Sequence, residues 1–338
     1  MHIPEKNGIL FDSQESCTLC NNKCNMVTIK KIEIKNFFGK GDFCWELDSC
    51  VNILGGMNGS GKSTILKYCY AMMTNEKVCH DMDVQLSKIA DAFVITFSNG
   101  WSINWCKRQN KPIKITIKNA KFSFTMNGRK TTIKDEKGEE RTFDELYGQY
   151  KTDFISTFEQ YISSFKSNEQ PGGNTQQKDA MLLDLLIKEQ INVRNNDFRE
   201  FMENHIGDSE TDNEARNTYM TEYRKVYATL ESFLTNYDDK VSGNFEFKRN
   251  GQSFSYEYLS MGEKQILLLL LMIANMKGEP CIFFMDEPDL SMHIDWKEQL
   301  VSRIHALNPN MQIILTTHAP SVITGWFDHV HEVGELTK

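Results

Sequence analysis

The sequence contains no apolar run long enough to cross a membrane. Its longest apolar stretch, Ile266 to Ala274, is far shorter than the roughly 18 residues that a spanning helix needs, which favours a helix buried in the core. The N-terminus lacks the basic-then-apolar pattern of a secretory signal peptide. Nine cysteines form no framework of the kind found in small secreted domains. A cytoplasmic protein that does not use a membrane is therefore expected.

The composition is that of a globular protein. With 338 residues and 40% apolar content, the chain can bury a large core. Its mixture of helical and strand patterns predicts one elaborated α/β domain.

A glycine-rich stretch at residues 56–63 fits the phosphate-loop pattern G-x-x-x-x-G-K-[ST]. Glycines let backbone N–H groups wrap a phosphate, and the following helix directs its positive dipole end at the anion. Lys62 is predicted to contact the β- and γ-phosphates, and Ser63 to place its hydroxyl on Mg²⁺. The alternative is a chance glycine-rich turn. The candidate nucleotide-binding residues here are Gly56, Asn58, Gly59, Ser60, Gly61, Lys62, Ser63 and Thr64.

A second acidic motif supports the first. The apolar run at residues 281–285 predicts a buried parallel strand, and it ends in Asp286 and Glu287. Both carboxylates then emerge at the edge of the sheet where ligands bind. Asp286 is expected to hold Mg²⁺ through its water shell, and Glu287 to act as general base toward an attacking water. The alternative is a solvated turn after a core strand.

Two further short motifs accompany the phosphate loop and the acidic pair. Residues 259–265 read Leu-Ser-Met-Gly-Glu-Lys-Gln, and residues 316–318 read Thr-Thr-His. The set resembles the ATP-binding-cassette superfamily in the broad sense, which includes transporter ATPases, SMC and RecF-type DNA ATPases, and OLD-type ATPases of phage defence. The resemblance implies an α/β P-loop ABC-type fold with an antiparallel β subdomain and a helical insertion. It also implies hydrolysis of ATP, with Mg²⁺, to ADP and phosphate.

The resemblance assigns roles to three more residues. Ser260 and Gly262 would contact the γ-phosphate held by a second subunit in a head-to-tail dimer, and His318 matches the switch histidine. Two departures favour the OLD, RecF and SMC-like branch, an AAA family ATPase of the prokaryotic defence type. Met261 replaces a signature glycine, and His293 stands where transporters have aspartate. The second departure puts in doubt how the two active sites signal to each other.

The same resemblance divides the chain into four parts. Residues 1–25 form an N-terminal extension, 26–165 and 251–338 the two parts of the ATPase core, and 166–250 the helical insertion. Met26 is an alternative start to Met1. Within the extension, the cysteines have C-x-x-C-x-x-x-C spacing, but a zinc site needs a fourth ligand, for which Cys44 and Cys50 are the nearest candidates. The spaced cysteines are Cys17, Cys20 and Cys24.

The core pattern begins with two strands predicted in residues 27–54 and a helix over 62–73. Strand-like pieces at 92–97, 102–106, 113–117 and 122–126, joined by Asn-Gly turns, predict an antiparallel hairpin sheet. Residues 107–130 of this sheet form a basic surface, either for DNA or RNA or as an ordinary solvated face. Its basic residues are Lys107, Arg108, Lys111, Lys114, Lys118, Lys121, Arg129 and Lys130.

A strand predicted at residues 153–158 leads toward the Q-loop, whose glutamine contacts magnesium and water in this family. Gln160 is the candidate and Glu159 its rival. Residues 167–177 predict a linker or loop. Amphipathic stretches over 181–186 and 219–237, with polar residues 207–217 between them, predict a short helical hairpin. Its apolar stripe serves either hairpin packing or a partner.

These observations predict a cytoplasmic ATPase that closes around ATP as a homodimer or higher oligomer and opens on hydrolysis. The chain ends about twenty residues after His318, which leaves no room for a nuclease domain. A separately encoded effector, a nuclease or a toxin, is therefore expected, in an antiphage defence system. The alternatives are a RecF-like DNA repair ATPase and an ABC transporter motor subunit, which the altered signature and His293 disfavour.

Overall fold

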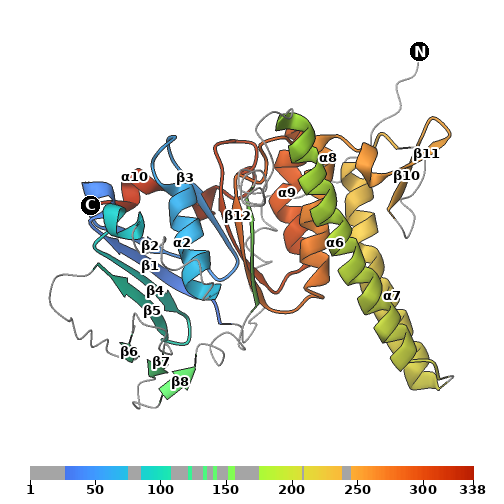
Figure 1. Cartoon of the computed structure of the whole chain (residues 1–338), viewed down its shortest axis with the longest axis horizontal. Helices are drawn as coiled ribbons and strands as arrows, with labels where there is room; N and C mark the ends of the chain where they lie inside the picture. The colour runs from blue at the N-terminus through green and yellow to red at the C-terminus, as the bar shows by residue number, and fades with distance from the viewer. Residues whose placement is uncertain are drawn as a thin grey trace.

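The structure is a computed structural model of the chain. It describes residues 27–74, 85–107, 121–123, 132–134, 140–142, 151–156, 175–207, 209–237 and 245–338. Figure 1 shows an antiparallel sheet and a parallel sheet with a helix between them, further helices on the other side of the parallel sheet, and a long helical hairpin that projects from the body. This is the α/β fold with an antiparallel subdomain and a helical insertion that the sequence predicts.

The central sheet has five parallel strands in the order β14-β3-β13-β12-β9. The strands are β3 (Val51–Gly55), β9 (Lys151–Ser156), β12 (Cys281–Asp286), β13 (Met311–Thr316) and β14 (Val330–Glu332). Every residue of β12 and β13 is buried. A sheet that is covered on both faces explains why these strands are continuous apolar runs rather than alternating ones.

The second sheet is antiparallel, in the order β2-β1-β4-β5. It consists of β1 (Ile29–Lys35), β2 (Phe43–Glu46), β4 (Ala92–Phe97) and β5 (Ser102–Cys106). Residues 27–55 therefore hold three strands, whereas two were predicted. The strand pattern breaks at the short 3-10 helix η1 (Phe37–Gly39), where Asn36 and Phe38 have left-handed backbone angles of 53° and 50° in φ.

Two small sheets complete the strands. One contains β6 (Lys121–Ser123), β7 (Thr132–Lys134) and β8 (Glu140–Thr142), and the other pairs β10 (Glu246–Arg249) with β11 (Gln252–Ser255). The predicted strand at residues 113–117 and the Q-loop candidates Gln160 and Glu159 lie outside the described residues. So do Cys17, Cys20 and Cys24 and, apart from Lys107 and the backbone of Lys121, the basic residues of 107–130. Lys107 lies 3.7 Å from the Asp91 carboxylate.

Helix α2 (Lys62–Thr74) packs between the two sheets. Its apolar face, Ile65, Leu66, Cys69 and Met72, is buried as the periodicity predicts. This core also takes Ile282 and Phe284 from β12, while Phe283 and Met285 face the second core on the other side of the sheet. Alternate β12 residues therefore serve opposite cores, as the period of two in a strand requires.

The second core is built by helices α8 (Met261–Asn275) and α9 (Ile294–Leu307) together with the base of the helical hairpin. Residues 266–271 of α8 are buried on all sides, which confirms the buried helix predicted from the apolar run. No helix in the described part of the chain is long and apolar enough to cross a membrane. Short helices η2 (Tyr256–Tyr258), η3 (Phe327–His329) and α10 (Val333–Leu336) connect the remaining elements.

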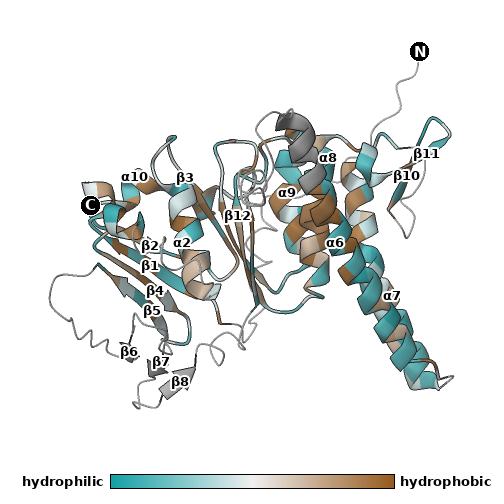
Figure 2. Cartoon of the chain, viewed as in Figure 1, coloured by the Kyte–Doolittle hydropathy of each residue, from teal (hydrophilic) through white to brown (hydrophobic). Residues whose placement is uncertain are grey.

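The helical hairpin consists of α6 (Thr175–Asn204) and α7 (Glu210–Phe233). It is longer than predicted, because α6 already begins inside the expected linker and α7 begins inside the expected polar connection. Ser209 caps α7, since its side chain accepts a hydrogen bond from the Asp212 amide, so the polar residues that follow belong to the helix. Figure 2 shows the distal part of α7 as mainly hydrophilic, which fits its projection away from the core.

Three polar links attach the hairpin to α8 and the residues that follow it. Lys264 lies 2.6 Å from the Asp184 carboxylate, and the ammonium group of this pair is almost fully buried. One side-chain nitrogen of Asn275 donates to the backbone and side-chain oxygens of Gln190. Lys277 pairs with Asp197, which lies farther along α6 than Gln190. These links fix the hairpin against both ends of α8.

We expect Phe284→Ala to lower the free energy of unfolding by about 3–5 kcal/mol, because it leaves a cavity between the sheet and α2. Phe284 is completely buried, whereas the control Phe327 is 66% exposed. Phe327→Ala should change the stability by only about 0.5 kcal/mol. Urea unfolding monitored by fluorescence measures both, and equal midpoint shifts would contradict this description of the core.

Candidate active site

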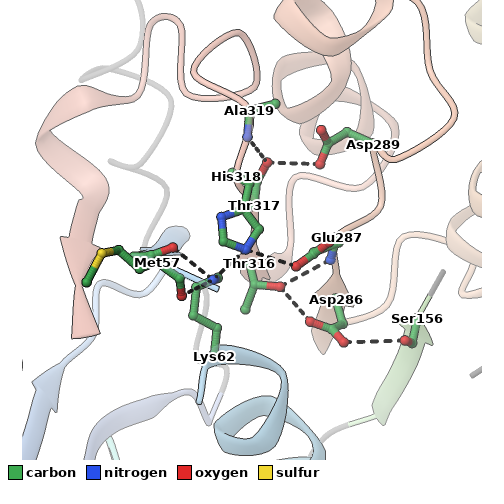
Figure 3. Close-up of polar contacts among 11 residues, drawn as sticks. Met57, Lys62, Ser156, Asp286, Glu287, Asp289, Thr316, Thr317, His318 and Ala319 are labelled. Carbon is green, nitrogen blue, oxygen red and sulfur yellow. Dashed lines mark hydrogen bonds and ion pairs between the residues drawn. The ribbon is translucent and has the colours of Figure 1, made fainter. Parts of the chain in front are cut away.

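The candidate catalytic residues meet at the carboxyl-terminal edge of the parallel sheet (Figure 3). Strand β3 leads into the phosphate loop, β12 into Asp286 and Glu287, and β13 into Thr317 and His318. Because β13 lies between β3 and β12 and all three run in parallel, the three segments emerge side by side.

The phosphate loop has the backbone conformation that its glycines permit. Gly59 and Gly61 have φ angles of 74° and 101°. A Cβ atom on Gly61 would lie 2.6 Å from the ring of Phe37, so that position has no room for a side chain. The Ser60 hydroxyl is buried and has no hydrogen-bond partner among the described residues. An orphaned donor beside the first turn of a helix, whose N–H groups lack intrahelical partners, fits a bound phosphate.

Lys62 is the first residue of α2, and its ammonium group is turned into the site. Its Nζ donates to the carbonyl oxygens of Gly56 at 2.9 Å and Met57 at 3.3 Å, and lies 2.7 Å from Nε2 of His318. Burial lowers the pKa of Lys62, while the nearby carboxylates of Glu287 and Asp286 oppose that effect. The positive charge of Lys62 is thus balanced by these two carboxylates rather than by solvent.

His318 links the lysine to the predicted general base. The same Nε2 atom that faces Lys62 lies 3.3 Å from the Glu287 carboxylate. One ring nitrogen cannot accept a hydrogen bond from the ammonium and also donate one to the carboxylate, so Lys62 and Glu287 compete for it. A change at either partner therefore alters the hydrogen bonding of His318.

Asp286 is buried and held by hydroxyl groups from two neighbouring strands. Thr316 donates to one carboxylate oxygen at 2.7 Å, and Ser156 approaches the other at 3.4 Å. In the sheet register Asp286 lies opposite both residues. Neither residue was assigned a role from the sequence: Thr316 is only the first residue of the motif that leads to His318, and Ser156 belongs to no motif. Strand pairing brings both hydroxyl groups to Asp286, because Ser156 and Thr316 are the last residues of the two strands that flank β12.

Glu287 has a left-handed backbone with a φ of 48°, which costs roughly 1–2 kcal/mol for a residue with a Cβ atom. The Thr316 carbonyl and hydroxyl oxygens both accept from its amide at 3.1 Å. These two bonds hold the chain in a turn that directs the carboxylate toward His318 rather than along the strand.

A partly buried ion pair is connected to the residues on either side of His318. Lys297 of α9 lies 3.1 Å from one oxygen of Asp289, and Thr317 donates to the other at 2.9 Å. The Thr317 hydroxyl in turn accepts from the Ala319 amide. A pocket opens here between Glu287, Asp289, Leu290, Lys297, His318 and Ala319. Sequence reasoning identified neither Asp289 nor Lys297 as part of the site.

His293 has a local structural role. It is the N-cap of α9, and its Nδ1 lies 3.4 Å from the Asp295 amide. The side chain is largely exposed. A capping histidine therefore occupies the position where transporter ATPases have aspartate.

The signature residues start α8. Ser260 is the exposed N-cap, and Gly262 lies where a Cβ atom would come within 2.3 Å of the Ser291 carbonyl oxygen. In the described part of the chain, the amide and hydroxyl of Ser260 bond only to Glu263. Tight packing is thus a reason for glycine at position 262 that is independent of any phosphate contact.

The oxygen atoms of this site suit a Mg²⁺ ion that is shared between the protein and a bound phosphate, rather than one enclosed by protein ligands alone. Among the described residues, no group of three or more His, Cys, Asp or Glu side chains is arranged to hold a metal. Asp286 is nevertheless a buried carboxylate at the carboxyl-terminal edge of the sheet, where the phosphate loop also lies, and Ser63 is the second residue of α2, which follows that loop. Mg²⁺ commonly takes one or two protein oxygens and completes its shell with phosphate and water, so these residues fit it.

We expect Gly262→Ala to destabilise the protein by about 1–3 kcal/mol, because the new methyl group must displace the Ser291 backbone from α8. The matched control is Gly334→Ala in α10, where a Cβ atom has nothing within 4 Å. That change should be neutral or slightly stabilising. Thermal unfolding of both variants decides the matter, and equal behaviour would contradict the close contact.

Comparison with known proteins matches residues 149–324 to the family described as "AAA domain, putative AbiEii toxin, Type IV TA system". The chain is 26% identical over 228 residues to the Retron Vc95 probable ATPase of Vibrio cholerae serotype O1 biovar El Tor, covering 61% of this chain and 40% of that protein. It is 29% identical over 163 residues to the Retron Ec83 probable ATPase of Escherichia coli, covering 43% and 30%. The chain thus spans less than half the length of either relative.

A solved structure described as an SmcHead bound to the C-winged helix domain of ScpA has a TM-score of 0.51 to this fold. It is 15% identical and covers 88% of this chain and 92% of that one. Such a likeness shows a common fold and no more. Since the family match covers just over half of the chain and contains the signature, the acidic pair and the switch histidine, the chain belongs to this family of AAA ATPase domains.

Proposed function

We propose that this protein is a cytoplasmic ATPase that binds ATP with Mg²⁺, hydrolyses it to ADP and phosphate, and uses the cycle to control a partner protein in antiphage defence. The observation that carries the proposal is the convergence of Lys62, His318 and Glu287 at one sheet edge, beside Asp286. The names of the two relatives, both probable ATPases of retrons, support the activity and the defence setting.

Each residue has a role that its position supports. Lys62, Ser60 and the loop amides, from Gly56, Asn58, Gly59 and Gly61 to Thr64, would hold the phosphates, and Ser63 and Asp286 would hold Mg²⁺. The metal would neutralise charge that develops on the phosphate oxygens. Glu287 would take the proton of the attacking water, and His318 would respond to the γ-phosphate that competes for Lys62.

A head-to-tail dimer explains the position of the signature. Ser260 is exposed at the N-terminus of α8, where the helix dipole favours an anion. Within the described chain, its amide and hydroxyl bond to Glu263 and not to the phosphate loop. At the loop tip Met57 is 84% exposed, an apolar side chain that a second subunit could cover. We therefore propose that Ser260 and Gly262 complete the site of a partner copy.

The helical hairpin is the natural site of coupling to an effector. Its ion pair and hydrogen bonds to α8 join it to the element that carries Ser260. A partner that prefers one state of the dimer would be held or released by at most the difference in its affinities for the two states. We propose a separately encoded nuclease or toxin as that partner.

The first test concerns turnover. Lys62→Ala should weaken ATP binding, whereas Glu287→Gln should retain binding and slow hydrolysis by about 10²–10⁴-fold, because it removes the water-activating base. Glu287→Gln should also accumulate a closed dimer with ATP, which size-exclusion chromatography detects. Adding Ser260→Arg to that variant should abolish the dimer. Wild-type rates in Glu287→Gln would refute the assignment.

The second test concerns the partner. The protein, expressed with its neighbouring genes, should co-purify with a partner whose retention differs between Glu287→Gln and wild type in the presence of ATP. Glu46→Gln makes the same chemical change at the exposed end of β2 and should behave as wild type. A protein that purifies alone, and whose activity survives deletion of each neighbouring gene, would argue against control of an effector.

A further inference from the structure

Glu263 connects the signature serine to elements far from it in the sequence. One carboxylate oxygen accepts from the Ser260 amide at 2.7 Å, and the Ser260 hydroxyl accepts from the Glu263 amide at 3.4 Å. This reciprocal capping box starts α8 and orients Ser260. In an ordinary capping box the glutamate is exposed, but only 12% of the Glu263 side chain is exposed.

The other oxygen of Glu263 is held from two sides. Tyr237, which follows α7, donates its hydroxyl at 2.7 Å, and Arg249, at the end of β10, lies 3.6 Å away. The Arg249 guanidinium lies over the Tyr237 ring, 4.5 Å from its centroid. Phe247 and Phe254 pack against the same ring, with centroids 5.6 Å and 5.8 Å away. The Glu263 carboxylate is thus held in place by Tyr237 and Arg249, whose own positions are set by the packing around the Tyr237 ring.

The electrostatics agree with this geometry. Burial alone would raise the pKa of Glu263, yet the hydrogen bonds from Tyr237 and Ser260 hold the pKa below its ordinary value. The carboxylate is therefore ionised and remains a strong acceptor for the Ser260 amide.

We propose that Tyr237 and Arg249 are positioning residues for Ser260: by holding Glu263, they keep the signature N-cap in the orientation that meets the partner subunit's nucleotide. The inference rests on the proposed function, in which Ser260 acts across the dimer. It adds that the base of α7 and the β10–β11 hairpin determine how well a subunit serves its partner's site. Neither residue contacts the phosphate loop of its own subunit in the described structure.

The decisive variant is Tyr237→Phe, which removes the hydroxyl and keeps the packed ring. Tyr219→Phe is the matched control, because Tyr219 donates to Asp197 at 3.0 Å in the same hairpin, away from the signature. Each variant loses one tyrosine–carboxylate hydrogen bond, so their thermal midpoints should fall by similar amounts. Only Tyr237→Phe should lower kcat, by about tenfold, as expected for losing a bond to a charged group.

Affinity and turnover separate positioning from a merely structural role. Binding of a fluorescent ATP analogue to the phosphate loop should be unchanged in Tyr237→Phe, while its kcat and ATP-dependent dimerisation fall. If Tyr237→Phe does not fold, Arg249→Gln tests the same carboxylate from another element. It should lower kcat about threefold, because the Arg249 partner of this charge pair is itself largely exposed and such pairs contribute little. Arg249→Lys should restore most of the loss.

Two negative results are distinguishable. A wild-type protein that neither hydrolyses ATP nor dimerises with it would overturn the proposed function, and this inference with it. Normal wild-type turnover, together with a Tyr237→Phe variant whose kcat stays within about twofold of that of Tyr219→Phe, would overturn the positioning role alone.

Discussion

Backbone hydrogen bonding between the parallel strands β3, β13 and β12 holds the candidate site together. Each strand leads at its carboxyl end into one segment of the candidate site: the phosphate loop, His318 or the acidic pair. Since the strands are buried on both faces, a shift in register would move apolar side chains out of two cores at once. The distances between Lys62, His318 and Glu287 are therefore set by the packing of the whole sheet and not by the loops alone.

Helix α8 and the base of the helical hairpin form a second unit. Helix α8 carries Ser260 at its start, and its buried Lys264 pairs with Asp184 of the hairpin. Removing one partner would leave an uncompensated charge in the interior, whereas the intact pair fixes the relative placement of the two helices. With Glu263 held by Tyr237 and Arg249, the signature, the hairpin base and the β10–β11 pair form one polar network.

Much of the fold could be predicted from local patterns. The helix after the phosphate loop, the buried helix α8 and the strand that ends in Asp286 follow from periodicity and apolar runs, because these signals depend on residues close in the sequence. Element ends were predicted less well. The turn at Asn36, the start of α6 at Thr175 and the start of α7 at Glu210 depend on single backbone angles or caps that polar composition obscures.

The chemical groups of the candidate site could be predicted from the amino-acid sequence alone: a glycine-rich loop with Lys62 and Ser63, an acidic pair after an apolar strand, and a histidine after the next strand. These are short motifs whose residues act through local backbone geometry. Which side chains support these motifs follows only from the three-dimensional fold. Ser156 and Thr316 reach Asp286 through strand pairing, Lys297 reaches Asp289 from α9, and Tyr237 reaches Glu263 from the end of α7. Such contacts join residues distant along the chain, and spatial proximity of that kind leaves no periodic trace in a single sequence.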